Sequence, residues 1–161
     1  MSDITIRPSK ESDYEAVRDL YILEYSQYHK EYPHAYKKVT KSILTRGNWL
    51  TMIEEKKEIT MVALDGDKVV GHIYAYPDDV EDNEVSKKSH RLEIGQVAVA
   101  KGHQRKKIAT RLIREIMEYA AKKKYDEVAA LVYAFNDPSI KLFESAGLTQ
   151  YSIKYTKRLK P

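Results

Sequence analysis

A basic turn about two thirds of the way along the chain carries the clearest chemical signal. Arg105, Lys106 and Lys107 follow Gln104 and precede an apolar periodic segment that begins at Ile108. If a helix begins there, its first backbone N–H groups lack partners inside the helix and point at whatever lies in front of it. Such groups bind anions, phosphates above all, and the cationic side chains add to the attraction. The pattern indicates a site for an anionic cofactor, although many basic turns are simply solvated.

The segments around this turn predict a strand, a helix and a second strand. Residues 91–100 carry few charges, which is typical of a strand, and residues 109–123 predict a helix with a continuous apolar row. Residues 127–135 are dense in apolar side chains, as expected for a central strand. Pro138 then suits the first turn of a last helix that ends at Gly147. The basic turn is therefore expected between a strand and the helix that follows it.

Two motifs in this region match the pattern of a known family. Gln104 and Ala109 occupy the first and last positions of the frame Gln/Arg-x-x-Gly-x-Gly/Ala, with Lys107 in place of the first glycine. A second frame, Asn-x-x-Ala-x-x-Leu-Tyr-x-x-x-Gly-Phe, is matched at Asn136, Leu142 and Gly147, nearly matched at Ser139 and Leu148, and departed from at Phe143. On these motifs the chain resembles the GNAT superfamily of acetyl-CoA-dependent N-acetyltransferases, from about residue 4 to residue 159 and loosely before Val69.

The resemblance implies a fold and an activity. The expected fold is α/β of the α+β type, with a mixed, mostly antiparallel sheet of roughly six to seven strands and about four helices, splayed between the fourth and fifth strands. One N-acetyltransferase domain would span residues 1–161. It would move an acetyl group from acetyl-CoA, as co-substrate, to a primary amine by direct attack in a ternary complex. The alternative is a catalytically weakened relative that binds acyl-CoA without turnover, which the departures at Lys107 and Phe143 suggest.

The resemblance also implies which residues bind the cofactor. Backbone amides on the strand before the turn would polarise the thioester carbonyl, and the turn would hold the phosphates. An asparagine at the exit of the next strand would bind the pantetheine arm or an ordered water. The implied residues are Val97, Ala98, Val99, Gln104, Arg105, Lys106, Lys107, Ile108, Ala109, Thr110, Asn136, Ser139 and Phe143. At Lys107 a lysine is expected to fit only if φ is negative, because glycine alone takes any φ freely.

Glu93 is the candidate general base. An amine with a pKa of about 10.4 costs roughly 4.6 kcal/mol to deprotonate at pH 7, so a proton acceptor is needed. Glu93 is an acid on an otherwise apolar strand, and it falls where family members with a glutamate base place theirs. It could instead be an exposed strand acid, or could bind the acceptor's charge without taking a proton. His72 and His90 are weaker alternatives.

The departing thiolate has no obvious proton donor. Family members often use a tyrosine where this chain has Phe143, so Tyr133 and Tyr151 are only weak candidate acids. A thiol with a pKa of about 8.5 leaves tolerably well as the anion, and retained activity is the favoured reading.

The rest of the sequence predicts the framework. Residues 4–6 alternate like a first strand, a tyrosine-rich helix starts near Tyr14, and a shorter helix covers residues 38–46 and ends at Gly47. Two strands flank a hairpin turn at Asp65-Gly66, and residues 151–159 alternate like a closing strand. The tyrosine stripe is either a core face or a wall of the acceptor site. The acidic loop at residues 78–84 could attract a cationic amine.

Composition limits the classes of function. The 161 residues include no cysteine, which excludes disulfides, thiolate metal ligands and an acyl-cysteine intermediate. No metal site and no membrane segment are expected, and a cytoplasmic location follows by default. The net charge of +4 fits an anionic cofactor, while the basic residues form no stripe of the kind that binds nucleic acid. The amine acceptor stays open. So does a homodimer, for which the tyrosine-rich helix or the last strand could serve.

Overall fold

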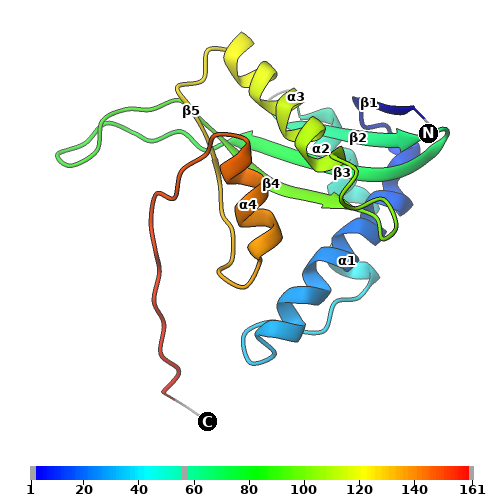
Figure 1. Ribbon diagram of the computed structural model, residues 1–161. Helices are drawn as coiled ribbons and strands as arrows, with labels where there is room; N and C mark the ends of the chain where they lie inside the picture. Colours follow the sequence, from blue (N-terminus) through cyan, green and yellow to red (C-terminus); the bar gives the residue numbers. More distant parts are fainter. Residues whose placement is uncertain (1–2, 56–57, 160–161) are drawn as a thin grey trace.

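A twisted five-stranded sheet organises the part of the chain that the computed structural model describes, residues 3–55 and 58–159. The strands follow one another in chain order across the sheet, antiparallel except for the last pair, which is parallel (Figure 1). They are β1 (Ile4–Pro8), β2 (Ile59–Asp65), β3 (Lys68–Pro77), β4 (Arg91–Val99) and β5 (Glu127–Ala130). The mixed α+β architecture and the mostly antiparallel sheet confirm the expected fold class.

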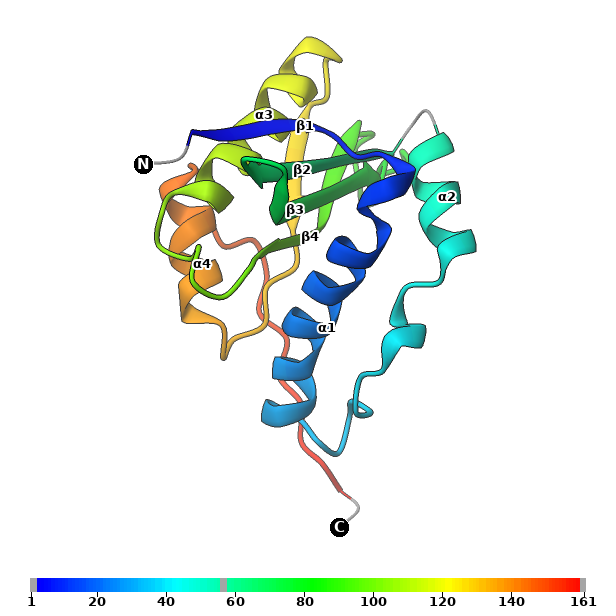
Figure 2. The same ribbon diagram turned by 90° about the vertical axis from the view of Figure 1, so that its right-hand side faces the viewer.

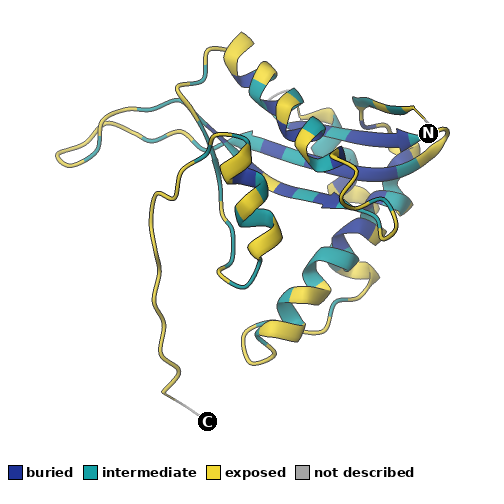
Figure 3. Ribbon diagram, viewed as in Figure 1, coloured by how far each residue is buried: buried dark blue, intermediate teal, exposed yellow. Residues whose placement is uncertain are grey.

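Helices cover both faces of the sheet (Figure 2). On one face lie α1 (Tyr14–Glu31) and α2 (Arg46–Glu54), which pack through Val17, Tyr21 and Trp49 onto β2. On the other lie α3 (Ile108–Lys122) and α4 (Asp137–Ser145), which contribute five apolar side chains of α3 and Phe143 of α4 to the larger core. Burial is therefore concentrated in the central strands and the inner faces of the helices (Figure 3).

The helix α3 confirms the predicted helix to within one residue at each end. Its apolar row is buried, with Leu112 and Ile116 fully excluded from water. The helix also approaches β3 closely, because a Cβ on Gly71 would lie 3.0 Å from Cγ2 of Ile108 and 3.2 Å from Cδ1 of Leu112. A side chain at position 71 would push the helix, and the turn in front of it, away from the sheet.

The fourth and fifth strands separate after four residue pairs. Strand β5 pairs with β4 only from Arg91↔Glu127 to Ile94↔Ala130, and the predicted strand 127–135 thus ends at Ala130. On its other side, β4 stays paired with β3 as far as Val99, with an irregularity at Gly95. The predicted splay between the fourth and fifth strands is present. From Gly95 onward, β4 has no pairing with β5.

Two predicted elements differ from the structure. The sheet holds five strands among the described residues instead of six to seven, because residues 151–159 alternate in polarity but pair with no strand of the described sheet. The short helix predicted at 38–46 is also wrong: a 3-10 turn covers Lys41–Ile43 and α2 starts at Arg46. Thr45 accepts a hydrogen bond from the Asn48 N–H and so begins a helix where Gly47 was expected to end one.

Candidate active site

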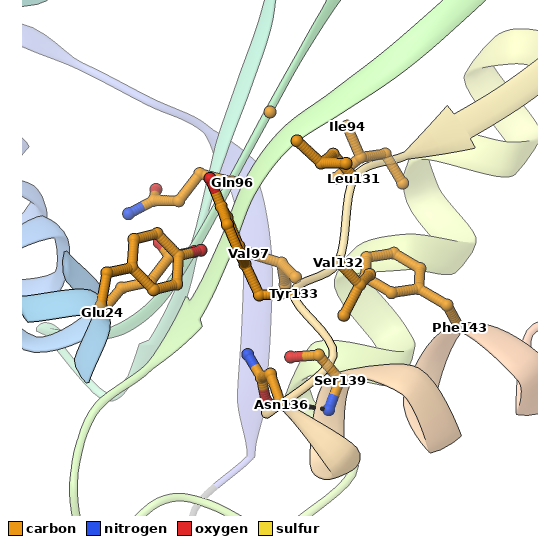
Figure 4. Close-up of a pocket in the computed structure, with 12 residues that line it drawn as sticks. Glu24, Ile94, Gln96, Val97, Leu131, Val132, Tyr133, Asn136, Ser139 and Phe143 are labelled. Atoms are coloured by element: carbon orange, nitrogen blue, oxygen red, sulfur yellow. Dashed lines mark hydrogen bonds between the residues drawn. The ribbon is translucent and has the colours of Figure 1, made fainter. Parts of the chain in front are cut away.

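The splay of the sheet forms a pocket. It lies between the second half of β4 and the segment that follows β5, with α1 on one side and α4 on the other, and about 370 Å³ in it is free of protein atoms. Its lining residues are Glu24, Tyr28, Ile94, Gly95, Gln96, Val97, Leu131, Val132, Tyr133, Asn136, Ser139 and Phe143 (Figure 4). Five of them, Val97, Tyr133, Asn136, Ser139 and Phe143, were predicted as site residues from the sequence.

The backbone of β4 presents unpaired groups to this pocket. The Ala100 N–H donates to the Val70 carbonyl on β3, at 2.9 Å. Because backbone groups alternate along a strand, the N–H groups of Val97 and Val99 point the opposite way, toward the side that β5 has left. The Gln104 amide donates to the Val99 carbonyl at 3.3 Å, which agrees with that direction. Of the three predicted carbonyl-polarising amides, the geometry therefore favours Val97 and Val99 over Ala98.

The basic turn has an unusual backbone. Lys107 is the N-cap of α3 and has φ +60°, so the expectation that φ there is negative is wrong. Arg105 also has a positive φ of 62°. Both residues occupy the left-handed region that glycine adopts without strain, which explains why the family pattern has glycine at position 107. The chain retains the glycine-like conformation while presenting a lysine.

The start of α3 fits a bound anion. Thr45 and Asn136 cap α2 and α4 with side-chain oxygens, whereas the side chain of Lys107 makes no such bond at α3. The first N–H groups of α3 are therefore left for another acceptor. Arg105, Lys106 and Lys107 are all exposed beside them. Phosphate oxygens would satisfy the N–H groups and the cations together.

Asn136 and Ser139 have a structural role at the pocket wall. The Asn136 side-chain oxygen accepts a hydrogen bond from the Ser139 N–H, at 3.2 Å, and so caps α4 (Figure 4). Phe143, two turns into that helix from the cap, is 8% exposed and belongs to the main core. The cap fixes where α4 starts and hence where all three residues meet the pocket.

Glu93 lies on β4 outside the set of residues that line the pocket. It pairs with Ala129 across the last stretch where β4 and β5 are joined, and its carboxylate lies by the Leu131 N–H at the splay. Burial raises the pKa of the Glu93 carboxyl, opposed by the nearby charge of Arg91. A raised pKa suits a proton acceptor, and Glu93 lies on the strand that leads into the pocket.

Glu24 is a second carboxylate, and it does line the pocket. Burial raises the pKa of the Glu24 carboxyl to about 7, against the opposing effects of the Gln96 amide and the Tyr28 hydroxyl. The Tyr28 hydroxyl donates to Oε1 of Glu24 at 3.2 Å. Its other oxygen, Oε2, is buried without a hydrogen bond of good geometry among the described residues, and so is Nε2 of Gln96. A buried carboxylate with one oxygen left over has room for a ligand's hydrogen-bond donor.

A buried polar chain runs from the sheet to Gln96 and fixes which way its amide points. Oγ of Ser9 lies 2.9 Å from Oγ1 of Thr60, and Oγ1 of Thr60 lies 2.7 Å from Nε2 of His72. Nδ1 of His72 lies 2.5 Å from Oε1 of Gln96. Burial lowers the pKa of His72 to about 4, so the ring is neutral at pH 7 and carries one proton. With that proton on Nδ1, His72 donates to Oε1 of Gln96 and leaves its amide N–H groups for the Glu24 side.

The buried position of His72 weakens it as an alternative base. The residue is completely excluded from water and bonded at both ring nitrogens. His90, the other alternative, is held by Asp79 at 2.6 Å and stacks on Tyr125, with ring centroids 3.9 Å apart. Both histidines thus have structural partners that account for them.

The tyrosine stripe of α1 is divided between the core and the pocket. Tyr21, near the middle of the helix, is buried in the core with Trp49. Farther along, Tyr28 lines the pocket and its ring lies 4.8 Å from that of Tyr133. Tyr133 in turn shares a short hydroxyl–hydroxyl contact with Tyr36. That bond from Tyr133 raises the pKa of Tyr36 to about 12.

Tyr151 is not brought to the pocket by this chain. It lies on the segment after α4 and is 95% exposed. Glu24 and Gln96 were missed by the sequence reasoning, which named Tyr28 only as a member of the tyrosine stripe. The helical spacing indicates that Tyr28 belongs to an apolar stripe. For Glu24 and Gln96, which are polar residues among apolar neighbours, the sequence gives no indication that they are buried.

Within residues 3–55 and 58–159, no three His, Cys, Asp or Glu side chains are grouped so that they could hold a metal ion. In the same part of the chain, no helix combines the length and the apolar character that crossing a membrane requires.

Comparison with known families gives a match over most of the chain. The model of the acetyltransferase (GNAT) family matches residues 14–148, which include the pocket, the basic turn and both motifs. No curated protein sequence matches the chain.

Solved structures resemble this one over nearly its whole length. A mutant of the BH1408 protein from Bacillus halodurans has a TM-score of 0.91 at 18% identity, covering 97% of this chain and 99% of that one. An aminoglycoside 6'-N-acetyltransferase from Acinetobacter baumannii has a TM-score of 0.73 at 16% identity, with 99% and 100% covered. An aminoglycoside acetyltransferase from an uncultured soil metagenomic sample, in complex with sisomicin, has a TM-score of 0.68 at 19% identity, with 98% and 97% covered.

Proposed function

The chain belongs to the GNAT family of acetyltransferases, and on that premise we propose that it is an N-acetyltransferase that uses acetyl-CoA. One domain, residues 1–161, would carry the reaction. A primary amine attacks the thioester carbonyl directly, the C–N bond forms, the C–S bond breaks, and CoA leaves as the thiolate. The amine gives its proton to a carboxylate of the chain.

The splayed sheet supports this proposal most directly. Among the described strands, none pairs with the β5 side of β4 at Val97, which lines the pocket, or at Val99, two residues farther along. N–H donors placed in this way stabilise the negative charge that develops on a carbonyl oxygen. The uncapped start of α3, with Arg105 to Lys107, suits the phosphates of CoA. Asn136, Ser139 and Phe143 border the space between these two places, where the pantetheine arm would lie.

Two carboxylates compete for the role of base. Glu93 is the candidate by its position on β4, and its pKa is raised by burial. Glu24 faces the pocket itself, and its pKa of about 7 suits proton transfer at neutral pH. If Glu24 accepts the proton, Glu93 is left to bind the positive charge of the acceptor. We retain Glu93 as the candidate base and make the choice a matter of experiment.

Glu93→Gln and Glu24→Gln should be compared at saturating acetyl-CoA and amine. The variant that lacks the base should lose roughly 10²-fold or more in kcat, and its rate should follow the ionisation of the amine instead of a group on the enzyme. The other variant should change mainly the KM for the amine. If both variants keep the parent's rate and pH profile, neither carboxylate is the base.

The amine itself is proposed to belong to a small molecule. The two aminoglycoside acetyltransferases that share the fold suggest this class, and the pocket wall of Tyr28 and Tyr133 beside Glu24 would accept an amine with an apolar stem. A panel of small amines, polyamines, amino acids and lysine peptides should be screened for free CoA release. Peptide amines as the preferred substrates would refute this choice of class.

Binding of the cofactor can be tested without turnover. Acetyl-CoA at a hundred times its Kd should stabilise the fold by about 2.7 kcal/mol. Charge reversal at both Arg105 and Lys106 should reduce this shift. Unaltered binding in that variant would place the phosphates elsewhere, and no shift in the parent together with no CoA release would overturn the proposed function.

Phe143 bears on whether the enzyme is weakened. Phe143→Tyr supplies the hydroxyl that family members often use, and it should change kcat little because a thiolate leaves readily near neutral pH. A large gain in kcat would favour the alternative of an acyl-CoA-binding relative with poor turnover.

A further inference from the structure

A second hollow lies beside the pocket, on the other side of the tyrosine rings of α1. The chain leaves the C-terminal end of α1 and runs back along that helix before it enters α2 (Figure 2). Between the returning segment and α1, about 790 Å³ is free of protein atoms, in a hollow that opens to solvent. The reaction proposed above gives this hollow no role.

The lining of the hollow is partly apolar and partly basic. Tyr25, Val39 and Ile43 supply half-buried apolar surface. Lys37 and Lys38 also line it and are exposed, and no salt bridge among the described residues includes either lysine. None of the described residues that line the hollow is acidic. The hollow therefore presents two positive charges whose partner must come from outside the described chain.

Two hydroxyl groups add a hydrogen-bond donor to this lining. Oγ1 of Thr40 lies 2.7 Å from Oγ of Ser42, and the Ser42 N–H donates to Oγ1 of Thr40 at 3.4 Å. Two hydroxyls that share one hydrogen bond keep one O–H for another acceptor. Two ammonium groups and a spare O–H are the donors that bind an oxyanion such as a carboxylate.

The segment that carries these groups is fixed at both ends. Nδ1 of His29 on α1 lies 2.7 Å from the carbonyl oxygen of Tyr36. At the far end, the Tyr14 hydroxyl donates to the Leu44 carbonyl at 2.9 Å, and the Leu44 side chain is buried in the core with Trp49. Both lysines lie between these two attachments, so their backbone holds them beside α1.

The hollow and the pocket share a wall of tyrosines. The Tyr36 hydroxyl, on the hollow, contacts the Tyr133 hydroxyl, on the pocket. Tyr25 of the hollow and Tyr28 of the pocket meet edge to face, with ring centroids 5.0 Å apart. Glu24 and Tyr25 are consecutive, and their side chains point about 100° apart around the helix. A carboxyl group thus lies on one side of the wall and two ammonium groups lie on the other.

We propose that the acceptor is an ω-amino acid, with its amine at Glu24, its carboxylate at Lys37 and Lys38, and its stem against the tyrosine wall. This inference rests on the proposed function, because it places the amine in the pocket where acetyl transfer would occur. The two ends lie on the order of 10 Å apart, since a helix with its side chains is about 10–12 Å across. An amino acid with both groups on one carbon is too short, and a diamine would bring a positive charge to the lysines.

Three amines with matched stems test the charge at the far end: 6-aminohexanoate, 6-aminohexanamide and 1,5-diaminopentane. Their binding is measured by calorimetry on the protein alone and again with CoA. The carboxylate should bind at least about 5-fold more tightly than the amide, because an exposed ion pair contributes up to roughly that factor. The diamine should bind most weakly. Equal affinities, or a preference for the amide or the diamine, would overturn the inference.

Charge reversal of the two lysines gives a second test. Lys37→Glu combined with Lys38→Glu should abolish the preference for the carboxylate over the amide and make the diamine the tightest of the three. Lys30→Glu combined with Lys41→Glu is the matched control, since it changes the net charge equally at two exposed positions outside the lining. The control should keep the parent's order of affinities. An unchanged order in the first variant, or the same reversal in the control, would refute the role of Lys37 and Lys38.

Release of CoA from acetyl-CoA separates this inference from the proposed function. If the three amines are acetylated with equal kcat/KM and bind equally, the inference fails and the proposed function stands. If none is acetylated, but the parent prefers 6-aminohexanoate and the reversed variant does not, the carboxylate site stands and the proposed reaction fails.

Discussion

Glu24→Gln should stabilise the protein at high pH and leave its stability nearly unchanged at low pH. The folded state holds the Glu24 carboxyl at a pKa of about 7, above its ordinary value of 4.5, because this side chain of α1 is buried against β4. The folded state therefore binds a proton more tightly than the unfolded state does. The contribution of Glu24 to the free energy of unfolding is fully present below pH 4.5. It is lost progressively as the pH rises toward 7, where the buried carboxyl becomes charged.

The magnitude follows from the two pKa values. Their separation of about 2.5, at about 1.36 kcal/mol for each pH unit, gives an upper limit of about 3.4 kcal/mol above pH 7. A glutamine of the same shape carries no charge and still accepts from Tyr28, so it avoids this loss. For a chain of this length the gain corresponds to a Tm higher by roughly 7–14 °C at pH 8.

Urea denaturation of the parent and variant at pH 4, 6 and 8 measures the effect. Burial raises the pKa of the neighbouring Tyr21, Tyr25 and Tyr28, so these hydroxyls stay neutral over this range and the carboxyl dominates the difference. Glu31→Gln, an exposed position on the same helix, is the control and should give no pH-dependent difference. A Glu24→Gln variant with equal stabilisation at pH 4 and pH 8, or with none at pH 8, would refute a buried carboxyl of raised pKa.

Three further predictions follow from the same geometry. His72 has a pKa of about 4, below its ordinary 6.5, so the stability it contributes is lost as the pH falls from 6.5. The Glu24→Gln variant lacks the opposite pH dependence that Glu24 contributes, so its free energy of unfolding should fall over this range more steeply than that of the parent. Equal slopes in the two denaturation series would refute this prediction. Lys107→Gly should raise the free energy of unfolding by about 1 kcal/mol by relieving the positive φ, while Lys107→Ala, which loses the charge but keeps the strain, should not; equal effects would argue against strain. Gly95→Ala should destabilise by about 1–3 kcal/mol, because its Cβ would lie 2.9 Å from Cε1 of Tyr76 and 3.1 Å from Cδ1 of Tyr74, and an unchanged denaturation midpoint would contradict this contact.

The sequence alone determined the elements whose signals are local. The apolar row of α3 fixed that helix to within a residue, and the Asp65-Gly66 turn fixed the hairpin of β2 and β3. The two motifs placed Asn136 and Phe143 on the pocket, because their spacing depends on one strand exit and one helix. In each case the residues that decide the structure lie within one or two turns of each other in the chain, so the pattern can be read without the fold.

The tertiary structure decided what depends on residues far apart in the chain. Glu24 reads as one polar position on an amphipathic helix, and only the packing of α1 against β4 buries its carboxylate beside Gln96 and raises its pKa. The number of strands was overestimated because alternation at 151–159 shows a capacity to pair and says nothing of the partner. The φ of Lys107 is set by the path of the turn between β4 and α3. Position 107 therefore keeps the positive φ that favours glycine, although the residue there is a lysine. Strand pairing, side-chain burial and the backbone conformation of such turns depend on contacts between segments far apart in the chain. The type of a single residue does not reveal these contacts.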